Sequence, residues 1–421
     1  MKSSHRNILV ATHRLPALFR LVLLVVCAAT HGLIAKAQPV FASEPVVPAI
    51  PAALQSTDTP PSTTSPTADP APLQWGTVTL RPRISYQFLH GDGILSRPGQ
   101  QSTTTLQSFR PGLQLNLGTH WIFDYGATQT YYSNSDFEDT LAHLLSLNGG
   151  AGYGQWQVQF SQNYSSSSAP LVQTGRQTDQ KSYDTALTVS YRFGTHMQLD
   201  TVLNQQVLLI DAPAPSTRNW YATERLNYRF SSRLNANVSV DYGYVSVTPG
   251  PDMTLIRPQA QLVWQPTDKV SLSLQGGSEK RKFRSGPADD LSTPSYSATI
   301  TYAPFENTKI TFITVREVAP SYVIGQLPKN TRWNIILDQR LFQYFHLHTG
   351  YAEEDSNYIT TGSAATIART DKGYLYNARL SATVFRRASI TALYQHRTLN
   401  SNLPGFSFSG SYVGFEIGYR Y

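Results

Sequence analysis

Only 14% of the 421 residues are charged, whereas 11% are aromatic and 24 are tyrosine. Soluble proteins carry about 25% charged residues, so the composition argues against a soluble globular protein. A mean hydropathy of -0.28, without long apolar runs beyond the N-terminus, argues against a bundle of membrane-spanning helices. Low charge, many aromatic residues and half-apolar segments together favour a transmembrane β-barrel.

Residues 1–37 have the three parts of a secretory signal peptide. Basic residues come first, an apolar stretch follows at 21–29, and Ala35-Lys36-Ala37 forms a small-x-small cleavage site before Gln38. The apolar stretch is well short of the ~20 residues of a membrane span, which disfavours a single anchor helix. We therefore expect export through the inner membrane and cleavage after Ala37.

Cleavage of the signal peptide changes both the charge and the cysteine content of the chain. Five Lys/Arg residues and the sole cysteine, Cys27, lie within it, so the formal net charge falls from +7 to +2, with 29 basic against 27 acidic residues. The remaining charge gives no support for nucleic-acid binding. A mature chain without thiols suits an oxidising compartment and uses no disulfides.

The segment 38–74 is predicted to be a disordered periplasmic linker rich in Pro, Ser and Thr. Nine prolines lie between Gln38 and Pro72. Such a segment cannot form a hydrophobic core, and we expect it to be extended and partly polyproline II. The alternative is a tether that reaches the cell wall or a partner.

From Trp75 to Tyr421, strand-like segments of about ten to fourteen residues alternate with turns, which predicts an all-β, antiparallel up-and-down transmembrane barrel. The short turns are Gly118-Thr119, Tyr153-Gly154, Gly194-Thr195, Ser231-Ser232, Pro266 to Asp268, Phe305 to Asn307, Gln343-Tyr344 and Arg386-Arg387. Longer polar connections occupy 91–102, 165–181, 284–294 and 357–371. Alternation of short and long connections is typical of outer-membrane barrels with periplasmic turns and extracellular loops. We expect about 18 strands, with 16–18 compatible with the pattern; a soluble β-sandwich, the alternative, lacks this rhythm of turns.

The two-residue period assigns the two faces of each strand. Between Arg233 and Val247, Leu, Ala, Val and Tyr residues alternate with Arg, Asn, Ser and Asp residues, so we expect one face toward lipid and one toward a lumen. Tryptophans such as Trp121, Trp156 and Trp264 lie beside short turns, where an interfacial girdle would be. Glu224 falls on the lipid face, which predicts either a bulge that shifts the register or contact with another subunit.

Arginines dominate the charged positions of the predicted lumen face, where they would favour anions or an acidic polymer. The lumen candidates are Arg81, Arg83, Arg110, Arg192, Arg225, Arg229, Arg257, Arg332, Arg340, Arg379, Arg397 and Arg420. The clearest acids on this face are Asp124, Asp200, Asp241, Asp338 and Glu416. The alternative is that these arginines pair with the acids and stiffen the wall.

His346 and His348 share one strand face, opposite Asp338 and Arg340 on the preceding strand. They could form an acid/base or metal pair, but two residues do not make a metal site, and the more ordinary interpretation is lumen lining. No phosphate-binding loop, zinc motif or dinucleotide fingerprint occurs. We therefore predict no catalytic residues, no metal and no cofactor, and we expect that the protein is not an enzyme.

The chain ends with Gly-Phe-Glu-Ile-Gly-Tyr-Arg-Tyr, in which Phe415, Ile417, Tyr419 and Tyr421 share one face. This segment resembles the carboxyl-terminal strand signal of bacterial outer-membrane barrels, in which the last residue is most often Phe rather than Tyr. The turns at Pro304 to Thr308 and Trp264 to Lys269 look like periplasmic turns of porin-like barrels. The resemblance, over Trp75 to Tyr421, is to the β-barrel porin type 2 group, which is sometimes associated with exopolysaccharide export.

The resemblance implies a Gram-negative outer-membrane location and recognition of the last strand by the barrel assembly machinery, but it transfers no site residues. We expect passive diffusion of small solutes, with a leaning toward anions, through an Arg-lined lumen. Export of an acidic exopolysaccharide is the main alternative. A barrel-embedded hydrolase and a purely structural barrel are the others. The sequence leaves the oligomeric state open.

Overall fold

The computed structural model describes residues 73–97, 100–168, 170–171, 176–212, 214–284, 289–319, 324–342, 344–361, 368–385 and 387–421. The predicted signal peptide and the predicted linker up to residue 72 lie outside the described residues. Leu73 and Gln74, at the end of the predicted linker, belong to a short strand, β1 (Leu73–Trp75), that pairs with the start of the barrel. No helix in the described part of the chain is long and apolar enough to cross a membrane.

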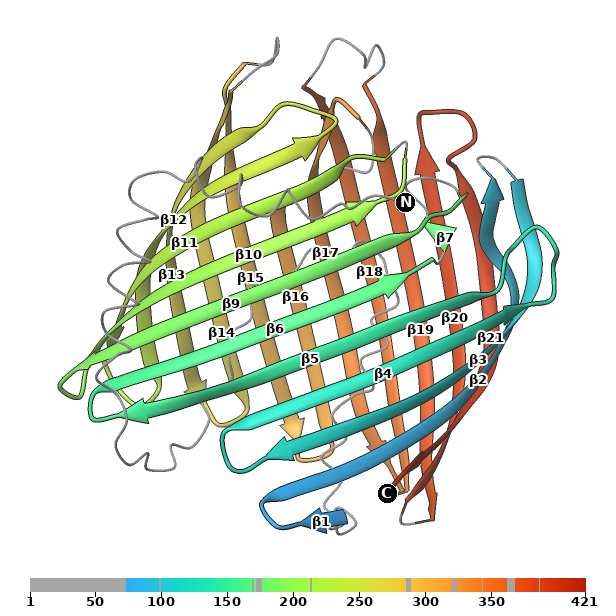
Figure 1. Ribbon diagram of the computed structural model, residues 1–421, viewed down its shortest axis with the longest axis horizontal. Coiled ribbons are helices and arrows are strands. Elements are labelled where there is room, and N and C mark those ends of the chain that lie inside the picture. The colour runs from blue at the N-terminus through green and yellow to red at the C-terminus, as the bar shows by residue number, and fades with distance from the viewer. Residues whose placement is uncertain are drawn as a thin grey trace, which may run out of the picture.

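The described residues form a closed antiparallel barrel of 18 strands, which confirms the predicted fold (Figure 1). The first half comprises β2 (Val78–Arg97), β3 (Gln100–Leu117), β4 (Trp121–Tyr132), β5 (Thr140–Tyr153), β6 (Trp156–Ser167), β9 (Gln180–Phe193), β10 (Met197–Ile210), β11 (Ser216–Arg229) and β12 (Leu234–Thr248). The second half comprises β13 (Met253–Thr267), β14 (Val270–Phe283), β15 (Leu291–Phe305), β16 (Thr308–Val318), β17 (Gln326–Leu341), β18 (Phe345–Thr360), β19 (Thr370–Phe385), β20 (Ala388–Ser401) and β21 (Phe408–Arg420).

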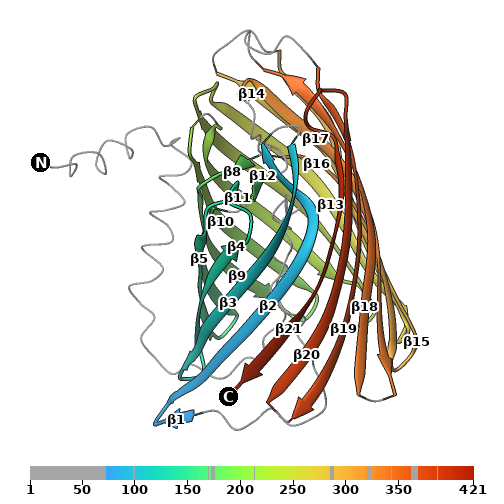
Figure 2. The same cartoon turned by 90° about the vertical axis from the view of Figure 1, so that its right-hand side faces the viewer.

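Each barrel strand pairs with its neighbour in the chain, and β21 pairs with β2 to close the wall. Figure 2 shows β2 and β21 side by side, with the C-terminus and β1 at the same end of the barrel. Each of the 18 described barrel strands therefore has a partner on both sides, which is what a β-structure in lipid requires.

The predicted short turns fall at the end of the barrel that carries the C-terminus, although Gln343 and Arg386 lie outside the described residues. Gly118, Gly154 and Gly194 have φ angles of 62°, 57° and 67°, which the tight hairpins there require and which glycine adopts without strain. At the other end the connections are longer, except the one between β2 and β3.

The predicted loop at 91–102 is wrong, because β2 runs to Arg97 and β3 begins at Gln100. Strands that extend beyond the hydrocarbon region need no apolar face, so polar residues there do not end them. The predicted loop between β6 and β9 contains a small hairpin, β7 (Pro170–Leu171) with β8 (Arg176–Gln177), which lies against β2. That hairpin therefore reaches across the strands β3, β4 and β5.

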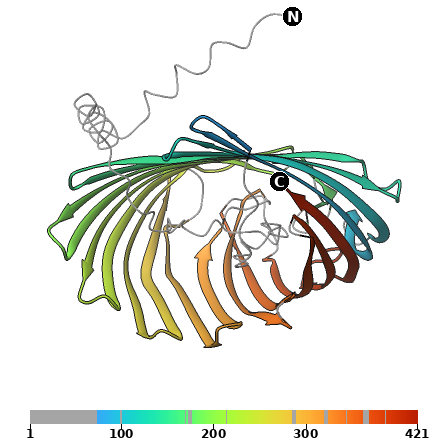
Figure 3. The same ribbon diagram turned by 90° about the horizontal axis from the view of Figure 1, so that it is seen from below.

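Accessibility distinguishes the two faces of the wall. On β12, Val240 is 44% exposed, whereas the adjacent Asp241 is 6% exposed. Side chains on the concave side of a barrel crowd one another, so the polar face is the inner one and the apolar face is the outer one. In cross-section the wall coloured blue to green is flatter than the wall coloured yellow to red (Figure 3).

Glu224 is exposed on the outer face, as its position in the sequence predicts. Its strand pairs with β10 and β12 in unbroken register, through Thr201 and Val240. The predicted alternative of a bulge is therefore wrong, and the outward direction of this carboxylate belongs to the regular strand.

Candidate functional site

The closing seam, where β21 pairs with β2, carries a charged network on the inner face. Arg83 on β2 donates two hydrogen bonds to Asp124 on β4, at 2.6 and 2.5 Å. Gly112 on the intervening strand makes room for this bridge, because a Cβ there would lie 2.7 Å from the Arg83 Nε. The paired geometry, with both partners partly buried, ties β2 to β4 across β3.

A second network crosses the seam itself. Arg110 on β3 donates to Gln87 on β2 at 2.6 Å and lies 3.4 Å from Glu416 on β21. It therefore connects the first two barrel strands with the last. Arg83 and Arg110 are therefore paired with acids, as the alternative interpretation of the lumen arginines predicted.

A mixed-charge cluster lies on the inner face of β12, β13 and β14. Arg257 bridges Asp241 at 2.7 Å and Glu279 at 3.4 Å. Arg281 also donates to Glu279, which is only 2% exposed, and to the Val318 backbone carbonyl at 2.8 Å. Two guanidinium groups thus share one buried carboxylate.

An apolar cluster adjoins this charged cluster on the inner side. Its buried members are Val245, Met253, Leu255, Val318 and Leu327. Arg281 connects the two clusters, because it contacts the Met253 sulfur at 3.7 Å as well as Glu279. Neither Glu279 nor this cluster was predicted from the sequence. The signal for the cluster was the apolar Val245 at a position of β12 where alternation predicts an inward, polar residue.

A third charged site was also missed because it lies in a predicted loop. Arg369 is 1% exposed, pairs with Asp371 at 2.7 Å and lies over the rings of Tyr358 and Phe406, at 4.8 and 4.1 Å from their centroids. It joins the β18–β19 connection to the β20–β21 connection. Desolvated cation–π contacts of this kind are worth ~2 kcal/mol.

The strand registers place the other candidate arginines on the same face as Arg83 and Arg257. These are Arg81, Arg192, Arg225, Arg229, Arg332, Arg340, Arg379, Arg397 and Arg420. Asp200 lies opposite Arg225, but the carboxylate instead accepts hydrogen bonds from Gln198 and Asn227, both at 2.7 Å.

Arg397 on β20 differs from the arginines held in ion pairs. Within the described residues its Nε and Nη2 atoms are buried and have no hydrogen-bond partner, as does the Oη of Tyr412 on the next strand. Its guanidinium lies 5.9 Å from the centroid of the Phe408 ring and interacts electrostatically with Glu354. Arg397 is therefore a charged group on the inner-wall side of β20 that is not neutralised by a hydrogen-bonded ion pair like those of Arg83 and Arg257.

The predicted histidine pair is only partly assembled. His348 Nδ1 lies 2.6 Å from the Asp338 carboxylate, and His346 lies opposite Arg340 rather than opposite an acid. Among the residues the structure describes, no group of three or more His, Cys, Asp or Glu residues could hold a metal ion. The pair therefore has the geometry of a wall contact.

Replacing both His346 and His348 with Ala is expected to leave lipid and peptide hydrolysis by membranes that contain the protein at the wild-type level. The reason is that neither imidazole contacts a nucleophile in the described structure. A hydrolysis screen on wild-type and variant membranes checks this. An activity present in the wild type and lost in the double variant would restore the enzyme hypothesis.

The predicted assembly signal lies at the seam. Phe415, Ile417 and Tyr419 alternate with inward residues on β21 and pair in register with Phe88, Tyr86 and Ile84 on β2. The Phe415 and Phe88 rings stack at 5.6 Å. The backbone N–H of Tyr421 donates to the carbonyl of Pro82 at 3.0 Å, so the last residue is itself part of the closure.

These features together define a class of protein. A closed 18-strand antiparallel barrel with an apolar outer face and a polar, charged inner face is a porin-like transmembrane β-barrel of the outer-membrane type.

No family model and no curated protein matches the chain. Among solved structures it is similar to OpdL of Pseudomonas aeruginosa, with 15% identity and a TM-score of 0.46 over 82% of this chain and 99% of that chain. It is similar to OccAB4 of Acinetobacter baumannii, with 9% identity and a TM-score of 0.46 over 83% and 99%. Pseudomonas aeruginosa OpdK, solved with vanillate, gives 10% identity and 0.46 over 82% and 98%. Because these identities and TM-scores are low, the protein class is assigned from the closed barrel itself and not from these similarities.

Proposed function

We propose that this protein is an outer-membrane channel through which small solutes diffuse passively, with a preference for anions. The closed 18-strand barrel with a polar concave face is the observation that carries the proposal. Smaller barrels of about 8 strands fill their interior with side chains, whereas barrels of about 16–18 strands leave an aqueous channel. No chemical step is needed, because the concentration gradient drives transport.

The anion preference follows from the balance of charge on the inner face. Inward arginines outnumber inward acids, and the acids near Arg83 and Arg257 are already engaged in ion pairs. Charged side chains that line a pore select permeant ions by sign. Arg397 adds a positive charge that no hydrogen-bonded acid neutralises in the described structure. Guanidinium groups bind carboxylate and phosphate with paired hydrogen bonds, so small anions are the solutes that such a wall favours.

Replacing Arg397 with Gln is expected to slow the entry of small carboxylates into liposomes that contain the purified protein, while neutral sugars enter at the wild-type rate. The substitution removes a charge without changing the strand pairing. Liposome swelling with isotonic solutes of both kinds measures the two rates.

Arg218→Gln is the matched control, because Arg218 is an exposed arginine on the outer face of the barrel. Its register partners there are Val207 and Ser246. Equal slowing of neutral and anionic solutes by Arg397→Gln would argue for a blocked pore rather than a selective one. Wild-type liposomes that admit neither solute would contradict the channel itself.

Export of an acidic exopolysaccharide stays a prediction, since the same arginines could line a path for such a polymer. A deletion strain distinguishes the two functions. Lost polymer secretion with unchanged permeability to small solutes would favour export, and the reverse result would favour diffusion.

A further inference from the structure

The outer face of the flatter wall carries hydrogen-bonding side chains at mid-strand. Gln162 on β6, Thr185 on β9 and Gln205 on β10 lie on one line of strand register, and Thr185 donates to the Gln162 side chain at 2.6 Å. Further along β10, beyond Leu203 on the same face, Thr201 donates to the Glu224 carboxylate at 2.8 Å. We call these five residues the outer polar row.

Lipid cannot satisfy this row. Each residue lies near the middle of its strand, at the depth of the acyl chains, which offer no hydrogen bonds. The Gln162 amide is satisfied within the chain, because it accepts from Thr185 and donates to the Asn163 carbonyl at 3.2 Å. Lipid offers no partner to the Gln205 amide, and a carboxylate such as Glu224 is still more costly there. The outer face of β12 shows the ordinary alternative, because Ala236, Val238 and Val240 occupy the same depth.

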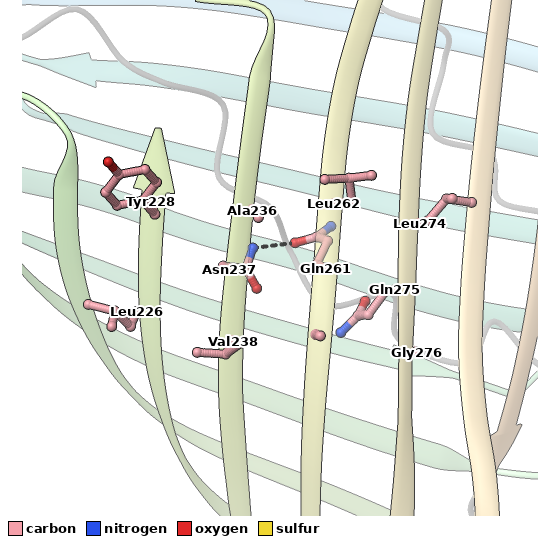
Figure 4. Close-up of a pocket in the computed structure, with 11 residues that line it drawn as sticks. Leu226, Tyr228, Ala236, Asn237, Val238, Gln261, Leu262, Leu274, Gln275 and Gly276 are labelled. Carbon is pink, nitrogen blue, oxygen red and sulfur yellow. Dashed lines mark hydrogen bonds between the residues drawn. The ribbon is translucent and has the colours of Figure 1, made fainter. Parts of the chain in front are cut away.

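An apolar groove adjoins the row. Figure 4 shows Leu226, Val238, Leu262 and Leu274 around it. Ala260 on β13 and Gly276 on β14 also line it. Its volume is ≈ 670 Å³, and a neighbouring hollow of ≈ 510 Å³ includes Glu224 itself. A Cβ at Gly276 would meet no atom within 4 Å, so the hollow is open above this residue.

We propose that the outer polar row and the adjoining groove form an interface with a second copy of this chain. Glutamine side chains carry both donors and acceptors, so the row is complementary to itself. A second copy in the same membrane necessarily presents the same row at the same depth. An acyl chain cannot present such a row, and an unrelated protein need not. The polar row itself lies on the flatter wall, which lets two sheets approach face to face there.

Single-cysteine variants in native membranes test this interface directly. The sequence contains one cysteine, Cys27, in the predicted signal peptide, so Gln205→Cys and Glu224→Cys would introduce the only thiols of the mature chain. Ile300→Cys and Tyr376→Cys are matched controls, because both positions are exposed outward on β15 and β19. A membrane-permeant bismaleimide is expected to give a covalent dimer from the first pair and none from the controls.

A second measurement covers the stability of the assembly. The Gln205→Leu/Glu224→Leu variant, extracted in mild detergent, is expected to lose the oligomer that the wild-type protein shows in native mass spectrometry, while its folded barrel persists. Equal crosslinking at all four cysteine positions, or at none, would overturn the interface. A wild-type mass of one chain with bound lipid would overturn it in favour of a lipid site.

Discussion

Replacing Tyr419 and Tyr421 with Asp is expected to abolish accumulation of the folded barrel in the outer membrane. Tyr419 pairs in register with Ile84 across the seam, and the Tyr421 N–H donates to the Pro82 carbonyl at 3.0 Å. The Arg387 guanidinium lies 4.0 Å from the centroid of the Tyr421 ring, which adds a cation–π contact at the same corner. A charged side chain on the lipid face next to the seam would oppose both closure and insertion.

The measurement is the amount of heat-modifiable barrel in the outer-membrane fraction. Tyr344→Asp is the control, because Tyr344 is 70% exposed in a short turn at the same end of the barrel and contributes nothing to closure. The control is expected to accumulate normally. Normal insertion of the Tyr419→Asp/Tyr421→Asp variant would show that the last strand is not what makes assembly possible.

Replacing Glu279 with Leu is expected to lower the free energy of unfolding by about 3–5 kcal/mol, the range for breaking a buried ion pair on one side. Glu279 is 2% exposed and is the shared partner of Arg257 and Arg281. Its loss leaves the Arg281 guanidinium buried among Met253 and Val318 without a counter-ion. Denaturant unfolding in detergent micelles, followed by intrinsic fluorescence, measures the loss.

Two controls separate burial from charge. Asp268→Asn removes a pair with Arg233 in which the aspartate side chain is 87% exposed, and it should cost about 0–1 kcal/mol. Glu279→Leu/Arg281→Met removes both buried charges, and it should cost less than Glu279→Leu alone. A Glu279→Leu variant as stable as the wild type would mean that the cluster does not hold the inner wall together.

Much of this fold could be predicted from local pattern. A strand that faces lipid and water alternates every second residue, so the faces of Arg233 to Val247 could be assigned without coordinates. Tight hairpins need residues such as Gly118 and Gly194, which mark the turns. Both signals lie within a few residues of the feature they predict, and together they gave the number of strands.

The parts that could not be predicted depend on contacts between distant segments. Arg369 is buried because the ring of Tyr358 comes from β18 and the ring of Phe406 from the β20–β21 connection. Val318 and Leu327 join the inner apolar cluster although alternation assigns them no such role. Glu224 is the opposite case. Its outward direction was predicted from alternation, but the proposed reason for a carboxylate there is contact with a second copy of the chain.

Single-channel recording in planar bilayers tests the central claim, that this barrel is an open channel with an anion preference, most directly. Purified protein added to a bilayer under a KCl gradient is expected to give discrete conductance steps and a reversal potential of the sign set by chloride. A reversal potential of the sign set by potassium would contradict the role given to the inner arginines. A bilayer that contains folded, inserted protein but shows no conductance steps would contradict the channel itself.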